Sequence, residues 1–254
     1  MSGTWLAVAV ISFGGGSERS VVVRDSAQTV YATTETVRIQ STLTPDQLRR
    51  VLQPAKATLR CIQFYKAKFS DAEYDILRSF PKLKRLSLSR VVNEMSSKRL
   101  VTGAPLKLDS LSVSGSRFID SPMAFANLHP SLKVLSIDTK QAVRLKGATV
   151  LTHLTTLTLS GRGELKELGG ISRLVSLKQL TVGNAHRLRG LRDISVAPKL
   201  QTLTISNPGR SEDIAILRRS QSLRRLLIFG ALYPDDEFDR LLNQLVGVHV
   251  TKID

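Results

Sequence analysis

The side chains of this chain that are most able to bind a metal or attack a substrate are four histidines and one cysteine. The histidines, His129, His153, His186 and His249, show neither the HExxH spacing of a metalloprotease helix nor a Cys–His spacing suited to zinc. His129 and His153 each come just before a predicted strand, where we expect a solvated or capping role. Cys61 has no activating base near it, so we interpret it as structural or neutral. The pattern predicts no metal site.

The glycine motifs that bind nucleotides are incomplete. Gly14–Gly16 is followed by Ser17-Glu18-Arg19, whereas a phosphate-binding loop continues with Lys-Ser or Lys-Thr. Gly161-x-Gly163 lacks both the third glycine and the strand–turn–helix setting of a dinucleotide site. The sequence also contains no Gly-x-Ser-x-Gly elbow for a serine nucleophile. We therefore predict that the protein is not an enzyme and takes no cofactor and no small-molecule substrate.

Positive charge is the remaining chemical feature, since 37 Lys and Arg face 21 Asp and Glu for a net charge of +16. Many of these cations recur at intervals of about 23 residues, in two sets. The first set, which we call the strand-end rim, holds the candidates for contact with RNA or another polyanion: Lys66, Lys68, Arg90, Arg117, Lys140, Arg162, Arg187 and Arg210. The second set, the strand-start rim, comprises Arg60, Lys84, Lys107, Lys133, Lys178, Lys199 and Arg224. Two such rims would attract an acidic protein or a nucleic-acid backbone.

The element that positions these cations is a repeat of the form Leu-x-x-Leu-x-Leu, with an aliphatic residue, Phe or Thr allowed at each Leu. Ten copies follow one another at steps of 22 to 25 residues. They are Thr34/Val37/Ile39, Leu59/Ile62/Phe64, Leu83/Leu86/Leu88, Leu108/Leu111/Val113, Leu132/Leu135/Ile137, Leu154/Leu157/Leu159, Leu177/Leu180/Val182, Leu200/Leu203/Ile205, Leu223/Leu226/Ile228 and Leu245/Val248/Val250. A period of this length predicts a stack of strand-plus-return units that share one apolar core.

The chain resembles the leucine-rich-repeat superfamily, most clearly at Leu154–Gly161 with Leu165 and Leu168. The resemblance implies an α/β solenoid, with a curved parallel sheet on the concave side and helices and irregular segments on the convex side. The family usually places Asn or Cys eight residues after each repeat start. Here that position holds Ala67, Val91, Ser116, Lys140, Arg162, Ala185, Pro208 and Ala231, while Asn184 and Asn207 come one residue early. This departure points to an irregular subclass with less well-bonded turns.

Alternation along each strand predicts which side chains line the concave face. Its middle column reads Arg38, Gln63, Ser87, Ser112, Ser136, Thr158, Thr181, Thr204, Leu227 and His249, a hydroxyl-rich strip with bulk and charge at its ends. Apolar and arginine side chains usually anchor protein interfaces. The predicted protein-binding residues are therefore Tyr65, Arg85, Arg225, Leu227 and Phe229.

Helices are expected toward both ends of the repeat array. Thr44–Gln47, with Pro45 inside it, and Ser70–Glu73 are capping boxes, and Ser121-Pro122 is a weaker helix start. Four acidic residues within 235–239 suit the start of a last helix, where carboxylates favour the positive helix end. After Leu154 and Leu177 the apolar residues recur every third position, which favours tight 3₁₀-like returns in the centre.

We predict two regions. Residues 1–33 form capping strands and a turn, including a strand at Val21–Val23. Residues 34–254 form a solenoid of about ten units, whose last helix and strand form its C-terminal cap. Part of the first region could alternatively be an organelle presequence. Its apolar stretch Trp5–Ile11 is too short to span a membrane and lacks the positive start of a signal peptide. The single cysteine favours a reducing, intracellular compartment, with cytoplasm, nucleus and mitochondrion left open.

These features predict a non-catalytic scaffold or adaptor that binds a protein partner, itself acidic or part of a larger complex, through the concave face and the basic rims. One alternative is a structural subunit or assembly factor of an RNA-containing complex such as a ribosome, with the rims on the RNA backbone. Few exposed aromatic residues are available to stack on bases, which argues against sequence-specific reading. Another alternative is the substrate-recognition module of a ubiquitin ligase, although the first 33 residues look strand-like and offer no docking helix pair.

Overall fold

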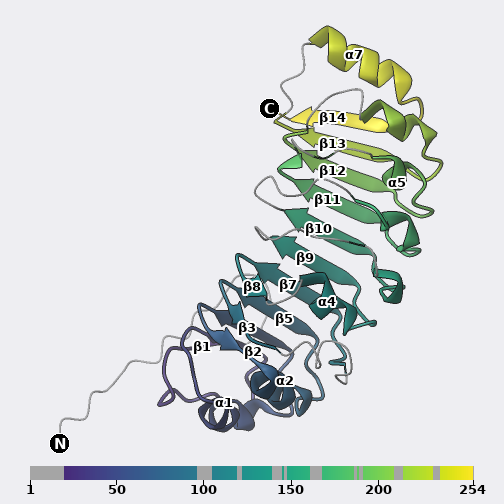
Figure 1. Ribbon diagram of the computed structural model, residues 1–254. Helices are drawn as coiled ribbons and strands as arrows, with labels where there is room; N and C mark the ends of the chain where they lie inside the picture. The colour runs from purple at the N-terminus through teal and green to yellow at the C-terminus, as the bar shows by residue number, and fades with distance from the viewer. Residues whose placement is uncertain are drawn as a thin grey trace, which may run out of the picture. The chain divides into compact units, whose positions relative to one another are not determined.

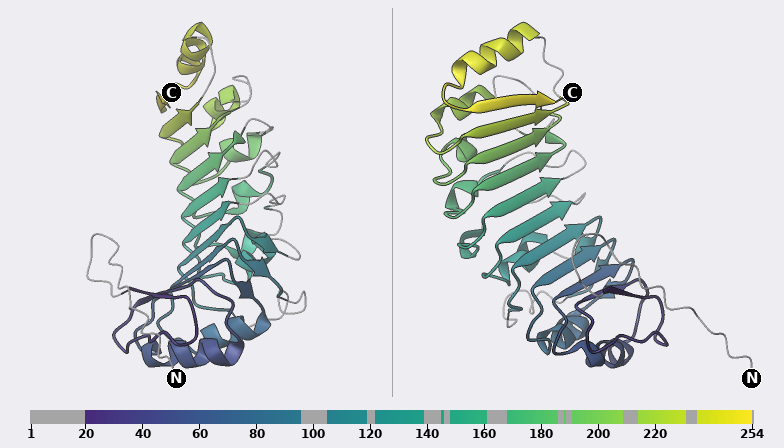
Figure 2. Two further views of the ribbon diagram at one scale, coloured as in Figure 1. Left: turned by 90° about the vertical axis from the view of Figure 1, so that its left-hand side faces the viewer. Right: turned by 180° about the vertical axis from the view of Figure 1, so that it is seen from behind.

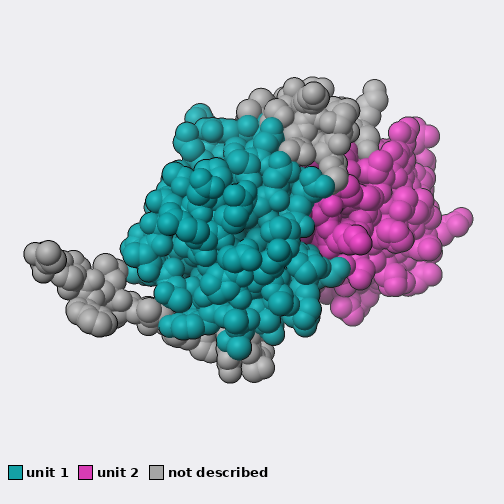
Figure 3. All heavy atoms as spheres, turned by 90° about the horizontal axis from the view of Figure 1, so that it is seen from below, with its two compact units in different colours: residues 1–102, 116–119 teal, residues 103–115, 120–254 magenta. Residues whose placement is uncertain are grey.

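The computed structural model describes residues 20–95, 105–118, 122–138, 145, 148–160, 168–185, 188, 191–208, 214–230 and 235–253. The chain divides into two compact units, which comprise residues 1–102 with 116–119 and residues 103–115 with 120–254 (Figure 3). Within each unit, parallel strands form one layer and short helices with their connecting turns form the other (Figure 1).

The sheet of the first unit has its strands side by side in chain order. They are β1 (Ser20–Val23), β2 (Thr36–Ile39), β3 (Cys61–Tyr65) and β5 (Arg85–Ser89). The register aligns Val21, Val37, Ile62 and Leu86, all of which are buried. The predicted strand at Val21–Val23 is thus confirmed, and as β1 it extends the apolar core of the repeats by one further strand.

Two helices of the first unit begin where the capping boxes predict. Helix α1 (Pro45–Leu52) has Thr44 as its N-cap, and α2 (Asp71–Arg78) has Ser70, each with both hydrogen bonds of the box. A 3₁₀ turn, η1 (Gln53–Ala55), follows α1 directly. The side chains that the two helices bury are Leu48, Val51, Leu52, Tyr74, Ile76 and Leu77, together with Glu73 of the second box.

A second, smaller sheet in the first unit was not predicted. It consists of β4 (Lys68–Phe69), β6 (Val92–Asn93) and β8 (Arg117–Phe118), again parallel. The chain reaches it by a sharp turn after the main strand, at Lys66 with φ 52° and Arg90 with φ 54°. Phe69 of β4 then packs edge-on against Phe64 at 5.1 Å between ring centroids, which anchors the small sheet to the core.

The left-handed turn recurs seven residues after the repeat starts. It is formed by Lys66, Arg90, Gly115, Asn184, Asn207 and Gly230, with φ between 49° and 61°. Asparagine and glycine tolerate this conformation better than other residues, which explains why Asn184 and Asn207 come one residue earlier than the family pattern. The amide of Asn207 also donates to that of Asn184 at 3.3 Å.

The following position of each repeat, eight after the start, is buried at Ala67, Val91, Ser116 and Ala185. Only a polar side chain can bond the turns together there, and Ser116 does so. Its hydroxyl accepts from the backbone N–H of Val91 at 3.0 Å and donates to the carbonyl of Leu88 at 2.9 Å. The departure from the family pattern predicted a less well-bonded turn at this position, whereas the structure gives the Ser116 hydroxyl two hydrogen bonds.

The second unit repeats the same architecture over seven strands (Figure 2). They are β7 (Ser110–Ser114), β9 (Val134–Asp138), β10 (Thr156–Ser160), β11 (Gln179–Gly183), β12 (Thr202–Ser206), β13 (Arg225–Phe229) and β14 (His249–Ile253), all parallel to their neighbours. The predicted core leucines of these repeats, Leu111, Leu135, Leu157, Leu180, Leu203 and Leu226, lie opposite one another and are at most 1% exposed. Their burial is confirmed.

The return segments of the second unit are short in the centre and longer at the ends, as predicted. They are α4 (Pro122–Asn127), η2 (Ala148–Val150), η3 (Ile171–Arg173), α5 (Arg192–Ser195), η5 (Ile216–Arg219) and α7 (Asp235–Gln244). Leu168, Ile171 and Leu174 are buried at every third position. A 3₁₀ turn has three residues per turn, so this spacing keeps all three on the core side.

The last repeat is where the predicted register is wrong. The sequence pattern places Val248 and Val250 opposite Leu226 and Ile228. The structure instead pairs Val250 with Leu226 and Lys252 with Ile228, a shift of two residues. His249 consequently does not continue the middle column of the sheet face beside Leu227, because Thr251 takes that place.

The shift arises between α7 and the last strand. Leu245 is buried as predicted, but a turn through Gly247, at φ 80°, then precedes the strand. The backbone N–H of His249 bonds to the carbonyl of Arg224, which starts the ladder two residues later than the repeat pattern implies. Lys252 therefore lies on the helix side, with its ammonium 5.5 Å from the ring centroid of Phe238 in α7.

His129 is fully buried, so the prediction of a solvated turn residue is wrong. The alternative prediction, a capping role, agrees better with its hydrogen bond to a backbone carbonyl. Its Nδ1 lies 3.3 Å from the carbonyl oxygen of Leu106, so the ring ties its own repeat to the preceding one. The ring also packs edge-on against Phe125, with 5.2 Å between centroids. Burial lowers the pKa of His129 to about 4, against the opposing effect of the bond to Leu106.

Candidate interaction surface

The outward side chains of the second unit's sheet form continuous rows. The middle row runs Ser112, Ser136, Thr158, Thr181, Thr204, Leu227 and Thr251, with each residue beside the next in register. All of them are half-buried, because neighbouring side chains of the same face flank them. The predicted hydroxyl strip is confirmed, except that Thr251 and not His249 follows Leu227.

An apolar and basic cluster lies at the last two strands of this face. Arg225 is exposed, and Leu227 and Phe229 of the same strand are half-buried. Ile253 pairs with Phe229 and is 37% exposed. We call Arg225, Leu227, Phe229 and Ile253 the C-terminal patch. The sequence predicted the first three residues and missed Ile253, because the repeat pattern assumed the wrong register for the last strand.

The two remaining predicted protein-binding residues, Tyr65 and Arg85, belong to the first unit. Tyr65 ends β3 on the outward face, and two cations contact its ring. The Lys66 ammonium lies 5.4 Å from the ring centroid, and the Arg90 guanidinium lies 5.9 Å from it and donates to the Tyr65 hydroxyl at 3.5 Å. We call these three residues the Tyr65 cluster.

The strand-end rim is described only in part. Lys66, Lys68, Arg90 and Arg117 are exposed and all belong to the first unit. In the small sheet Lys68 and Arg117 lie on either side of the exposed Val92. Lys68 forms an ion pair with Glu94 at 3.2 Å. The other candidates, Lys140, Arg162, Arg187 and Arg210, lie outside the described residues.

The strand-start rim is described completely. Its members are Arg60 and Lys84 in the first unit and Lys107, Lys133, Lys178, Lys199 and Arg224 in the second. Acidic neighbours pair with two of them, since Glu35 lies 3.7 Å from Arg60 and Asp109 lies 3.4 Å from Lys133. Exposed pairs of this kind contribute little to stability, so both cations stay accessible to a stronger anionic partner.

Within the described part of the chain, no three His, Cys, Asp or Glu side chains come close enough together to hold a metal ion. In the same part, no helix has the length and apolar character needed to cross a membrane. The charged and apolar surfaces of the two sheets are thus the features from which a function can be argued.

Comparison with solved structures agrees with this architecture. The structure is similar to an internalin (inlF) from Listeria monocytogenes, with a TM-score of 0.51, 17% sequence identity, and coverage of 93% of this chain and 67% of that one. An internalin C2 (inlC2) from the same species has a TM-score of 0.49 and 18% identity, covering 83% of this chain and 84% of that one. No family model and no curated protein matches the sequence. Internalins are leucine-rich-repeat proteins, so the fold is that of a leucine-rich-repeat solenoid, as the repeat pattern predicted.

Proposed function

We propose that the protein is a non-catalytic interaction scaffold that binds a protein partner through the outward face of its sheet, with the C-terminal patch as the anchor. The observation that carries the proposal is the juxtaposition of Leu227, Phe229 and Ile253 beside an exposed arginine on adjacent strands. A parallel sheet holds these side chains in fixed rows, so little conformational entropy is lost when a partner binds. Aromatic, apolar and arginine side chains commonly carry most of the energy of an interface.

The proposed partner presents acidic side chains around an apolar contact. Lys178 and Arg224 come directly before β11 and β13, and Lys199 comes three residues before β12; all three are exposed. Such rim charges raise the association rate more than the affinity, because they act at a distance through solvent. The single cysteine of the chain favours an intracellular setting for this interaction.

Replacing Leu227 and Phe229 together by Ala tests the anchor. We expect this variant to lose its partner in quantitative affinity purification, whereas Val196→Ala retains it. Val196 is the matched control because it is 60% exposed in the same unit but lies in the return segment beside α5. A photo-crosslinking residue at position 229 should capture the partner, and one at position 196 should not. Equal capture from both positions would contradict the proposal.

A second candidate function is contact with an RNA backbone through the strand-end rim of the first unit. The observation that favours it is the grouping of Lys66 and Arg90 on the Tyr65 ring, together with Lys68 and Arg117 in the small sheet of the same unit. Charge reversal of these four cations to Glu should then abolish RNA binding. Binding by the unaltered protein should also fall steeply as salt rises, because each phosphate contact releases counterions. If the charge-reversal variant no longer copurifies with the molecule bound by the unaltered protein, while the Leu227 and Phe229 variant still does, RNA is favoured over a protein partner.

A further inference from the structure

The return segments of four consecutive repeats in the second unit contain the same hydrogen-bonded turn. In each, a backbone N–H donates to the carbonyl three residues earlier: Leu151 to Ala148, Leu174 to Ile171, Ala197 to Ile194 and Ser220 to Leu217. The four acceptor residues are all buried, so each turn has the same orientation on the core. The residue just before each donor therefore occupies an equivalent place in all four repeats.

Valine and arginine alternate at this place. The residues are Val150, Arg173, Val196 and Arg219, which we call the Val–Arg row. All four are exposed, Val150 to 45% and Val196 to 60%, because in a turn of three residues the residue two after a buried one faces outward. The return segments η2, η3, α5 and η5 pack against one another in chain order, and Figure 1 labels α5 in this series. The row is therefore continuous across the four repeats.

The surroundings of the row are also apolar and basic. Val175 is 46% exposed, and Pro198 at the equivalent place in the next repeat is exposed as well. Lys199 of the strand-start rim is exposed directly after Pro198. Asp193 is the one carboxylate among the described residues of 148–156, 168–179, 191–202 and 214–225, and its Oδ2 accepts from the backbone N–H of Gly170 at 2.8 Å. This surface is therefore positively charged, with apolar side chains between the cations.

This composition selects a protein partner. A nucleic-acid backbone would pair with the arginines but leave the valines without a contact. Helices that lie on a membrane surface bury Trp, Phe or Leu, and the described residues of these return segments expose none of the three. A protein segment that carries both carboxylates and apolar side chains complements arginine and valine together.

The spacing of the row selects a helix. Successive repeats lie about 4.8 Å apart at ordinary strand spacing, and successive turns of an α-helix lie about 5.4 Å apart. A helix that crosses the repeats thus presents about one side chain to each, and the mismatch of about 0.6 Å per turn is small against the length of an arginine side chain. In an extended segment the side chains on one face recur only every 6.6 Å or so, which does not match.

We propose that the Val–Arg row docks an amphipathic helix of a partner protein, with apolar side chains on Val150 and Val196 and carboxylates on Arg173 and Arg219. On that helix the apolar positions are i and i+7, and the acidic positions are i+4 and i+11. The row lies on the return segments, whereas the C-terminal patch lies on the outward face of the sheet, so this inference does not rest on the proposed function. The two surfaces bind separate ligands, and Val196→Ala leaves the ligand of the C-terminal patch bound.

The test uses a synthetic helix of about 18 residues, built on Ala and Gln, with Leu at i and i+7 and Glu at i+4 and i+11. It is titrated into the full-length protein and followed by heteronuclear NMR. We expect saturable binding, and binding at least about fivefold weaker when Gln replaces both Glu residues of the peptide.

Variants of the protein then locate the contact. Arg173→Gln and Arg219→Gln should each weaken binding about fivefold, as expected for a partly exposed ion pair. Arg240→Gln is the matched control, because it removes the same charge from an exposed position on α7 of the same unit and should leave binding unchanged. Val196→Ser should weaken binding several-fold, and Val134→Ser should not, since Val134 is 39% exposed but lies on the outward face of β9.

Three results would overturn the proposal: no saturable binding of the peptide, an equal loss with Arg240→Gln, or no loss with Val196→Ser. Vesicles of phosphatidylglycerol and single-stranded poly(U) are titrated in parallel. If either binds through Arg173 and Arg219 while the peptide does not, the row is a surface for that polyanion and the helix proposal is wrong. The variant with Leu227 and Phe229 replaced by Ala should bind the peptide unchanged, which separates this test from that of the proposed function.

Discussion

The buried histidine at position 129 makes the stability of the second unit depend on pH in a way that can be calculated. In the folded protein the pKa of His129 is lowered from 6.5 to about 4, chiefly because burial disfavours the charged ring. A carbonyl oxygen can only accept, so the neutral ring carries its proton on Nδ1 and donates it to Leu106. Below pH 6.5 the unfolded chain binds a proton that the folded protein does not, and unfolding is favoured.

The magnitude follows from the size of this shift. Each pH unit is worth about 1.4 kcal/mol, so the folded state loses about 2 kcal/mol between pH 6.5 and pH 5, and about 3 kcal/mol once the pH reaches 4. Above pH 6.5 the ring is neutral in both states and the contribution is fully present. The loss therefore occurs on acidification, in the window between pH 6.5 and 4.

His129→Asn isolates the effect. The asparagine amide can still donate toward Leu106 but does not titrate, so carboxylates that titrate in the same range cancel when the variant is compared with the unaltered protein. Urea unfolding at pH 7.5 and pH 5.0, followed by circular dichroism, should show the unaltered protein losing about 2 kcal/mol more than the variant. Ser131→Ala is the control: it removes a 2.8 Å hydrogen bond to the carbonyl of Leu108 without removing a titrating group. If His129→Asn and the unaltered protein lose stability equally, the reasoning is refuted.

Three further substitutions test the packing and bonding of the repeats. Leu157→Ala leaves a cavity among fully buried strand residues and should destabilise the protein by about 2–5 kcal/mol in urea unfolding; a loss below about 1 kcal/mol would mean that the site is not packed as described. Ser116→Ala leaves the buried groups of Val91 and Leu88 without its hydroxyl and should cost about 1–3 kcal/mol, with faster amide exchange at Val91; unchanged exchange there would count against the bridge. Thr44→Ala removes the capping box of α1 and should cost about 1 kcal/mol, measured in the same way, whereas a neutral effect would show that the cap is not needed.

The proposed functions make predictions that do not depend on stability. Substitution of the C-terminal patch should remove a protein partner, and charge reversal of the Tyr65 cluster with its neighbours should remove RNA. The division into a capping region at 1–33 and one solenoid at 34–254 also stays a prediction. Limited proteolysis of the full chain would test it, since a single solenoid should resist cleavage between its two compact units.

The sequence alone was sufficient for the repeat, the buried face of nine units and the starts of α1 and α2. These features are local and periodic. A strand that alternates Leu with polar residues can bury only one face, and Thr44 or Ser70 with its partner three residues later closes a hydrogen-bonded box whatever lies elsewhere in the chain. Ten copies of one pattern also agree with one another, which removes the ambiguity of any single short strand.

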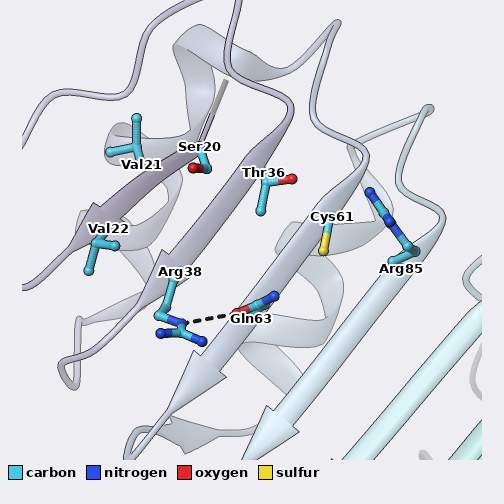
Figure 4. Close-up of a pocket in the computed structure, with 8 residues that line it drawn as sticks. All are labelled: Ser20, Val21, Val22, Thr36, Arg38, Cys61, Gln63 and Arg85. Carbon is cyan, nitrogen blue, oxygen red and sulfur yellow. Dashed lines mark hydrogen bonds between the residues drawn. The ribbon is translucent and has the colours of Figure 1, made fainter. Parts of the chain in front are cut away.

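The tertiary structure decided what depends on pairing between segments far apart in sequence. The register of the last strand follows from the turn at Gly247, and it brings Ile253 beside Phe229. The burial of His129 requires the preceding repeat to cover it. On the outward face of the first unit, β1, β2 and β3 align the short side chains of Ser20, Thr36 and Cys61 in one row, which leaves the sheet hollowed there (Figure 4), and no single strand carries that information. Periodicity specifies which face of a strand is buried, but only the assembled sheet specifies which side chains become neighbours.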